Sequence, residues 1–172
     1  MRHKSHRPNR RSIRLRGYDY ASPGAYFVTL CTQDRLCLFG EIIEGEMHLN
    51  EIGHMIKRWW LSIPRKFEHV DIDAYVIMPN HLHGIIVIKS MIERQHNVSL
   101  ASIVRWFKTR TTNDYIRGVK RMGWPPFRRR LWQRNYWEHI IRSERSLERI
   151  RRYIVENPLR WHLDQENPIH WK

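Results

Sequence analysis

The sequence is short of the features that mark secreted, disulfide-linked or membrane-spanning chains. Only two of its 172 residues are cysteines, Cys31 and Cys37, which is too few for a disulfide framework. There is no run of about 18 apolar residues that could span a membrane, and the N-terminal residues lack the pattern of a signal peptide. We therefore expect a cytoplasmic protein with two buried thiols and no membrane partner.

Acidic residues are also few. Asp and Glu number 17 against 31 for Lys and Arg, which gives a formal net charge of +14. This excess predicts a polyanionic partner, for which nucleic acid is the first interpretation and an anionic membrane surface the second. Hydrophobic residues make up 41% of the chain, so the composition is that of a folded protein and not of a disordered one.

The length of the chain predicts one domain with its own core. We place this domain at residues 18–165, between a basic tail over residues 1–17 and a short C-terminal tail over residues 166–172. The basic tail contains no acidic residue and is by itself typical of a solvated, disordered segment. Beside a DNA site it would neutralise phosphates without reading the base sequence.

Two later stretches share the basic character. A predicted helix over residues 99–117 carries cations on its polar face, and residues 118–130 interleave arginines with Trp124 and Phe127. Cations that hold phosphates beside rings that stack bases suit a flexible single strand, although a solvated face and a hydrophobic wedge remain alternatives. The candidate DNA-binding residues are Arg10, Arg11, Arg14, Arg16, Arg105, Lys108, Arg128, Arg129, Arg130 and Arg134.

Hydrophobic patterning predicts an alternation of strands and helices. Strands are expected over residues 25–32, 70–77, 81–88 and 131–142, with a hairpin over residues 38–50. Helices are expected from the N-cap Asn50 to Pro64, over residues 99–117, and over residues 147–157 after Ser143 or Ser146. The expected fold is therefore α+β: a ferredoxin-like (RRM-like) antiparallel sheet with helices on one face and an added C-terminal helix.

The third expected strand begins with the residues His81, Leu82 and His83. Side chains alternate along a strand, so the two histidines project from one face while Leu82 projects from the other. Two imidazoles on one face of a strand are a ready pair of metal ligands. They could equally be two hydrogen-bonded histidines at a sheet edge, and the spacing alone does not decide between the two interpretations.

The last expected helix carries a second pair of polar residues. Tyr153 and Asn157 are four positions apart, so they share a helix face that can overlook the sheet. From the pattern alone, Tyr153 would be interpreted as core packing.

Together these motifs give the sequence a family resemblance. It resembles the REP-associated tyrosine transposases, members of the HUH nuclease group, which also contains the single-strand transposases of the smallest bacterial insertion sequences. The resemblance runs from about residue 11 to residue 161. It rests on four stretches, Gly17–Tyr20, Pro23–Thr29, Ala74–His83 and Tyr153–Pro158.

The resemblance implies a set of site residues. His81, His83 and Asn157 would hold a metal ion, and Tyr153 would be the catalytic nucleophile. The insertion-sequence relatives usually carry glutamine where Asn157 stands, and either amide offers a carbonyl oxygen to a hard cation. An open set of two imidazoles and one amide oxygen fits Mg²⁺ or Mn²⁺ better than a closed zinc site.

The resemblance also implies a reaction and its partners. Tyr153 would cut single-stranded or hairpin DNA, forming a 5′-phosphotyrosine and a free 3′-OH that can later rejoin strands. The protein would act on the bacterial nucleoid as a monomer or a homodimer. Tyr136, with His139 as a ligand, is an alternative nucleophile. A non-catalytic RRM-like module that binds hairpin DNA or RNA, and a metal-dependent hydrolase that uses water, are the alternative functions.

Overall fold

The computed structural model describes residues 15, 17–90 and 98–171. Four strands form an antiparallel sheet in the order β4-β5-β1-β6. They are β1 (Gly24–Cys31), β4 (Val70–Ile77), β5 (His81–Ile88) and β6 (Trp137–Ile141). The helices are α1 (Glu51–Trp60), α2 (Ile63–Lys66), α3 (Leu100–Met122) and α4 (Glu144–Glu156), and a separate hairpin is formed by β2 (Gly40–Ile43) and β3 (Glu46–Leu49). The expected ferredoxin-like α+β fold is confirmed.

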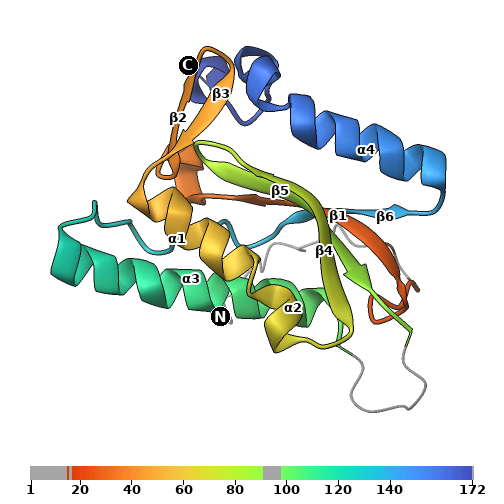
Figure 1. Ribbon diagram of the computed structural model, residues 1–172. Coiled ribbons are helices and arrows are strands. Elements are labelled where there is room, and N and C mark those ends of the chain that lie inside the picture. Colours follow the sequence, from red (N-terminus) through yellow and green to blue (C-terminus); the bar gives the residue numbers. More distant parts are fainter. Residues whose placement is uncertain (1–14, 16, 91–97, 172) are drawn as a thin grey trace, which may run out of the picture.

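The two faces of the sheet are covered differently. Helices α1, α2 and α3 lie on one face, and α4 crosses the other (Figure 1). On β1, the fully buried Tyr26, Val28 and Leu30 belong to the main core under α1 and α3. The alternate residue Phe27 belongs to a smaller core under α4, which contains Ile150 and Ile154. This alternation follows from the two-residue period of a strand.

Helix α3 runs past the end expected near residue 117. Gly118 lies inside it, and the ring of Trp124 packs against the backbone there. A Cβ at Gly118 would lie 2.1 Å from Trp124 Cε3, so a glycine is required at this position. The helix ends instead at Gly123, which has a left-handed φ of 70°, a conformation that glycine adopts at helix ends without strain. The helix is therefore Leu100–Met122 and not the expected residues 99–117.

The last strand is shorter than the expected residues 131–142. In the segment of residues 131–136, strand pairing is reduced to an isolated bridge between Trp132 and Thr32, the residue that follows β1. The indole N–H of Trp132 donates a hydrogen bond of 2.8 Å to Thr111 Oγ1 in α3. The segment is therefore held against α3 and does not extend the sheet.

Other expectations are confirmed or corrected in detail. Asn50, Ser99 and Ser143 cap α1, α3 and α4, each with its side-chain oxygen accepting a backbone N–H. Pro64 does not end the first helix; it lies in the first turn of α2, where proline is tolerated.

Cys31 is buried but Cys37 is exposed, so the expectation of a buried thiol is wrong for Cys37.

Some expectations fall on residues that the structure does not describe. Arg10, Arg11, Arg14 and Arg16 lie outside the described residues. Over residues 15, 17–90 and 98–171, there is no helix with the length and apolar character of a membrane span.

Gly84, between the second histidine and Ile85 on β5, provides a test of this packing. A Cβ at Gly84 would lie 2.3 Å from Cζ2 of the fully buried Trp60. Since a close-packed core accommodates added volume poorly, we expect Gly84→Ala to lower the free energy of unfolding by about 1–3 kcal/mol in urea denaturation. The cost should fall when the same change is made in a Trp60→Phe background, where the ring is smaller. An equal cost in both backgrounds would contradict this explanation.

Candidate active site

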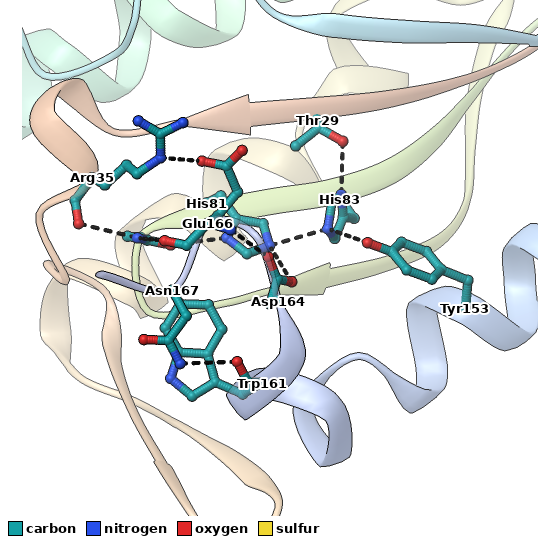
Figure 2. A network of polar contacts seen from close by, with 10 residues as sticks. Thr29, Arg35, His81, His83, Tyr153, Trp161, Asp164, Glu166 and Asn167 are labelled. Carbon is teal, nitrogen blue, oxygen red and sulfur yellow. Dashed lines mark hydrogen bonds and ion pairs between the residues drawn. The ribbon is translucent and has the colours of Figure 1, made fainter. Parts of the chain in front are cut away.

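Strand β5 presents His81 and His83 on the face of the sheet that α4 covers. Both imidazoles are buried, and their Nε2 atoms are 3.0 Å apart. Figure 2 shows the two rings at the centre of a network that joins β1, β5, α4 and the segment after α4. The metal-ligand interpretation requires both histidines on one face, and the structure places them there.

The neighbours of His81 define which nitrogen carries its proton. The Nδ1 atom of His81 is 2.8 Å from Asn80 Oδ1. The amide nitrogen of Asn80 already donates to the carbonyls of Arg35 and Glu166, at 3.0 and 2.7 Å, so its oxygen remains as the acceptor. His81 therefore carries its proton on Nδ1 and directs the lone pair of Nε2 toward His83.

His83 has a partner that can take either role. Its Nδ1 atom is 2.8 Å from the hydroxyl of Thr29 on β1, and a hydroxyl can accept or donate. When Thr29 accepts, the Nε2 lone pair of His83 also becomes available. An outer acceptor that orients the ring is the arrangement by which metal-ligating histidines are usually held.

Burial keeps both imidazoles neutral. Desolvation lowers the pKa of His81 to about 3. It also lowers the pKa of His83 well below its usual value, and the neighbouring His81 lowers it further. Neutral imidazole is the form that binds a metal ion, so the pair is available as a ligand pair at neutral pH.

Asp164 brings a carboxylate oxygen to the histidine pair, and Asn157 offers a second buried oxygen as a candidate ligand. The ligand atoms of His81, His83 and Asp164 all lie within 4.8 Å of one another, and Asp164 Oδ2 is 3.7 Å from His81 Nε2. Asp164 Oδ2 and Asn157 Oδ1 are both buried and accept no hydrogen bond from the described residues. Buried oxygens without partners are costly, and a cation would satisfy them. Two imidazole nitrogens with carboxylate and amide oxygens fit a divalent cation.

Asp164 was missing from the residues expected from sequence. It follows a 3-10 turn over Pro158–Leu163 that returns the chain over the histidines, with the ring of Trp161 5.9 Å from that of His81. Glu166, which was expected in a C-terminal tail, accepts a hydrogen bond of 2.7 Å from Arg35 Nε. One signal was available: Asp164 and Glu166 are the only acidic residues after Glu156.

Helix α4 brings Tyr153 to the histidine pair. Its hydroxyl is 3.3 Å from His83 Nε2, its ring contacts Phe27, and it remains 43% exposed. Burial raises the pKa of Tyr153 and the charge of Asp164 raises it further, while the Asn157 side chain acts in the opposite direction. Without a positive charge nearby, this phenol would be a weak nucleophile at neutral pH.

The alternative nucleophile Tyr136 lies elsewhere. It is 9% exposed and packs in the main core, on the opposite face of the sheet from His83. His139 is exposed on β6 and is not part of the cluster of His81, His83 and Asp164. The structure therefore does not bring Tyr136 to the histidine pair.

Four of the candidate DNA-binding residues line one groove between α3 and the segment of residues 130–136. The groove has a volume of about 570 Å³ and is lined by Arg105, Lys108, Arg130 and Arg134 among others. The amino group of Lys108 donates to the carbonyls of Gln133 and Asn135, at 2.8 and 3.2 Å. Burial lowers the pKa of Lys108 to about 8. Arg128 and Arg129 are exposed in the loop before the groove.

Known proteins resemble this chain over most of its length. An uncharacterised protein of Haemophilus influenzae is 43% identical over 166 residues, 91% of this chain and 92% of that protein. A second protein of the same organism, which carries the name REP-associated tyrosine transposase, is 27% identical over 145 residues, 83% of this chain and 74% of its own.

A solved structure has the same fold. It is that of a REP-associated tyrosine transposase bound to a REP hairpin, with a TM-score of 0.60 and 20% identity over 88% of this chain and 76% of that chain. Residues 26–157, which contain His81, His83, Tyr153 and Asn157, match the family described as IS200-like transposases. The chain therefore belongs to the IS200-like transposase family.

Proposed function

We propose that this protein cuts and rejoins single-stranded DNA beside a hairpin through a covalent bond to Tyr153. One observation carries the proposal: the Tyr153 hydroxyl lies 3.3 Å from the buried His83, which clusters with Asp164, and the buried Oδ2 atom of Asp164 accepts no hydrogen bond from the described residues. A structural histidine pair would not need unsatisfied oxygens beside it, and a core tyrosine would not be 43% exposed.

The proposed reaction is a phosphoryl transfer. The Tyr153 oxygen attacks the phosphorus of a DNA phosphodiester, the bond between phosphorus and the 3′ oxygen breaks, and the phenolic proton ends on the departing 3′-OH. The 5′ end remains bound to Tyr153 as a phosphotyrosine ester. Attack by a 3′-OH on this ester reverses the step and joins strands. Because the ester conserves the energy of the broken bond, no ATP is needed.

A divalent cation, Mg²⁺ or Mn²⁺, fits the site. His81, His83, Asn157 and Asp164 would hold it, and it would supply positive charge against the negative charge that develops on the reacting phosphate. Asn80 and Thr29 would orient the two imidazoles. Burial would keep both rings neutral and therefore able to bind.

Two observations support hairpin DNA as the substrate. The related transposase of known structure is bound to a REP hairpin, which makes a hairpin the first substrate to test for this chain. The groove of Arg105, Arg130 and Arg134 offers phosphate contacts on the α3 side, and there Lys108 fixes the segment that forms the wall. A module that binds hairpins without catalysis is the second candidate function, because the groove would be sufficient for binding.

Tyr153→Phe tests the nucleophile. A hairpin oligonucleotide with single-stranded flanks, incubated with Mn²⁺, should give a protease-sensitive protein–DNA adduct on a denaturing gel. Tyr153→Phe should abolish the adduct because it removes the attacking oxygen, whereas Tyr136→Phe should retain it. Cleavage without an adduct would indicate water as the nucleophile. Binding without cleavage, over varied sequences and both metals, would favour the binding module.

Asp164→Asn tests the metal site without measuring activity. We expect the variant to bind Mn²⁺ at least about tenfold more weakly in isothermal titration calorimetry, because an anionic ligand is lost. In metal-free buffer the variant should unfold at the same or a higher temperature, since it removes a buried negative charge whose Oδ2 atom accepts no hydrogen bond from the described residues. Glu156→Gln, which changes an acid paired with Arg160 outside the site, is the control. Unchanged Mn²⁺ affinity in Asp164→Asn would exclude Asp164 as a ligand.

Paired arginine substitutions test the groove. Arg105→Gln with Arg134→Gln should weaken hairpin DNA binding and reduce the slope of log affinity against log salt by about 2, one for each phosphate contact. The control is Arg58→Gln with Arg117→Gln, because both of these arginines are already paired with Asp114. If the control reduces the slope equally, general positive charge and not the groove accounts for binding.

A further inference from the structure

An exposed tryptophan lies in register with the candidate site. Trp137, the first residue of β6, is directly opposite Thr29 on β1, and Thr29 is directly opposite His83 on β5. Residues paired in this way point to the same face of the sheet. His83, Thr29 and Trp137 therefore form a row across three strands, on the face that α4 partly covers, and Trp137 stands at the β6 end of the row.

Core packing does not account for Trp137. Its side chain is 65% exposed, whereas the other tryptophans whose surroundings the structure describes are buried or half-buried. It stacks on no other ring among the described residues. Its neighbour Tyr136 points to the opposite face and is buried, so the exposure belongs to the site face of β6. A large apolar ring left in water beside a candidate active site is typical of a binding surface.

Charge and shape complete this surface. Arg149 lies one helical turn before Tyr153 on α4, so the two share a helix face. Arg149 is exposed and lines a hollow with Arg145, Arg152 and Glu148. None of these three arginines is paired with an acidic residue in the described part of the chain, and Glu148 is paired with Arg151. Strand β6 is the edge of the sheet, and no described strand covers it. Cations thus lie on the helix that carries Tyr153, and an exposed ring lies on the uncovered edge strand.

We propose that Trp137 stacks an unpaired nucleobase of the strand that Tyr153 attacks. The inference rests on the proposed function and deepens it. Strands are about 4.8 Å apart, which puts Trp137 roughly 10 Å from His83 across the sheet, within reach of a nucleotide adjacent to the scissile phosphate. A base paired in a duplex has no free face for an indole, so the platform selects single-stranded DNA.

The test uses binding, so it does not depend on cleavage. The protein would carry Tyr153→Phe. The probes would be hairpins with a short single-stranded oligo(dT) flank, each with one 2-aminopurine at a different position of the flank. Stacking on Trp137 should quench the fluorescence at one position. Trp137→Ala should abolish this quenching and weaken binding on the order of tenfold, the usual effect of losing one base-stacking ring. Trp137→Phe should retain most of both, because a smaller aromatic ring still stacks.

An abasic nucleotide at the quenched position provides the decisive comparison. If Trp137 stacks that base, the parent protein and Trp137→Ala should bind the abasic strand equally. Met122→Ala, which changes another exposed apolar residue at the end of α3, should leave binding unchanged. An equal loss with Trp137→Ala on normal and abasic strands, or no loss on either, would overturn the proposal.

The two proposals can fail separately. In one outcome, the unsubstituted protein gives no Tyr153 adduct, while fluorescence is quenched at one position and Trp137→Ala binds the abasic strand as well as its parent does. That result would support the stacking site and reject the strand-transfer chemistry. An adduct on Tyr153 without position-specific quenching would retain the chemistry and reject the role of Trp137.

Discussion

The structure depends on two neutral imidazoles that face each other at 3.0 Å in the interior of a sheet. Two adjacent nitrogen lone pairs repel unless a proton or a cation lies between them. The surroundings of the two imidazoles suit a cation between them. Asn80 fixes the proton of His81 on the far nitrogen, and the buried atoms Asp164 Oδ2 and Asn157 Oδ1 accept no hydrogen bond from the described residues. Each of these features is costly alone, and the proposed divalent cation would account for all of them.

The same face must also hold a helix at a fixed orientation. Helix α4 rests on a small apolar core in which Ile150 and Ile154 contact Ile85. Arg151 adds a two-pronged pair with both carboxylate oxygens of Asp73 on β4, at 3.0 and 2.7 Å, and this pair lowers the pKa of Asp73. Because the pair is partly exposed, its contribution to stability is modest. Its two-pronged geometry mainly sets the rotation of α4, and hence the position of Tyr153.

Local patterns predicted the elements, and contacts between distant segments determined the rest. Strands β4 and β5, on either side of residues 78–80, were predicted because a two-residue period and a proline turn are local features. Tyr153 and the histidines could be brought together only through a family resemblance, since no pattern within α4 says which sheet residue it faces. Asp164 was missed because its role depends on a 3-10 turn that returns the chain over β5. The end of α3 was expected too early for a similar reason: Trp124, which packs on Gly118, reaches it only after the chain has left the helix at Gly123.

Strand β6 connects the two surfaces that are proposed to bind nucleic acid. The chain passes from Arg134 and Tyr136, which line the groove on the α3 side, to Trp137 on the α4 side within four residues. The groove and Tyr153 thus lie on opposite faces of the sheet, and these two faces meet at the β6 edge. A strand held by its phosphates in the groove can reach Tyr153 only by bending over β6. A flexible single strand can make this turn, whereas a stiff duplex resists such sharp bending. The geometry of one short edge strand would therefore itself contribute to the selection of single-stranded substrate.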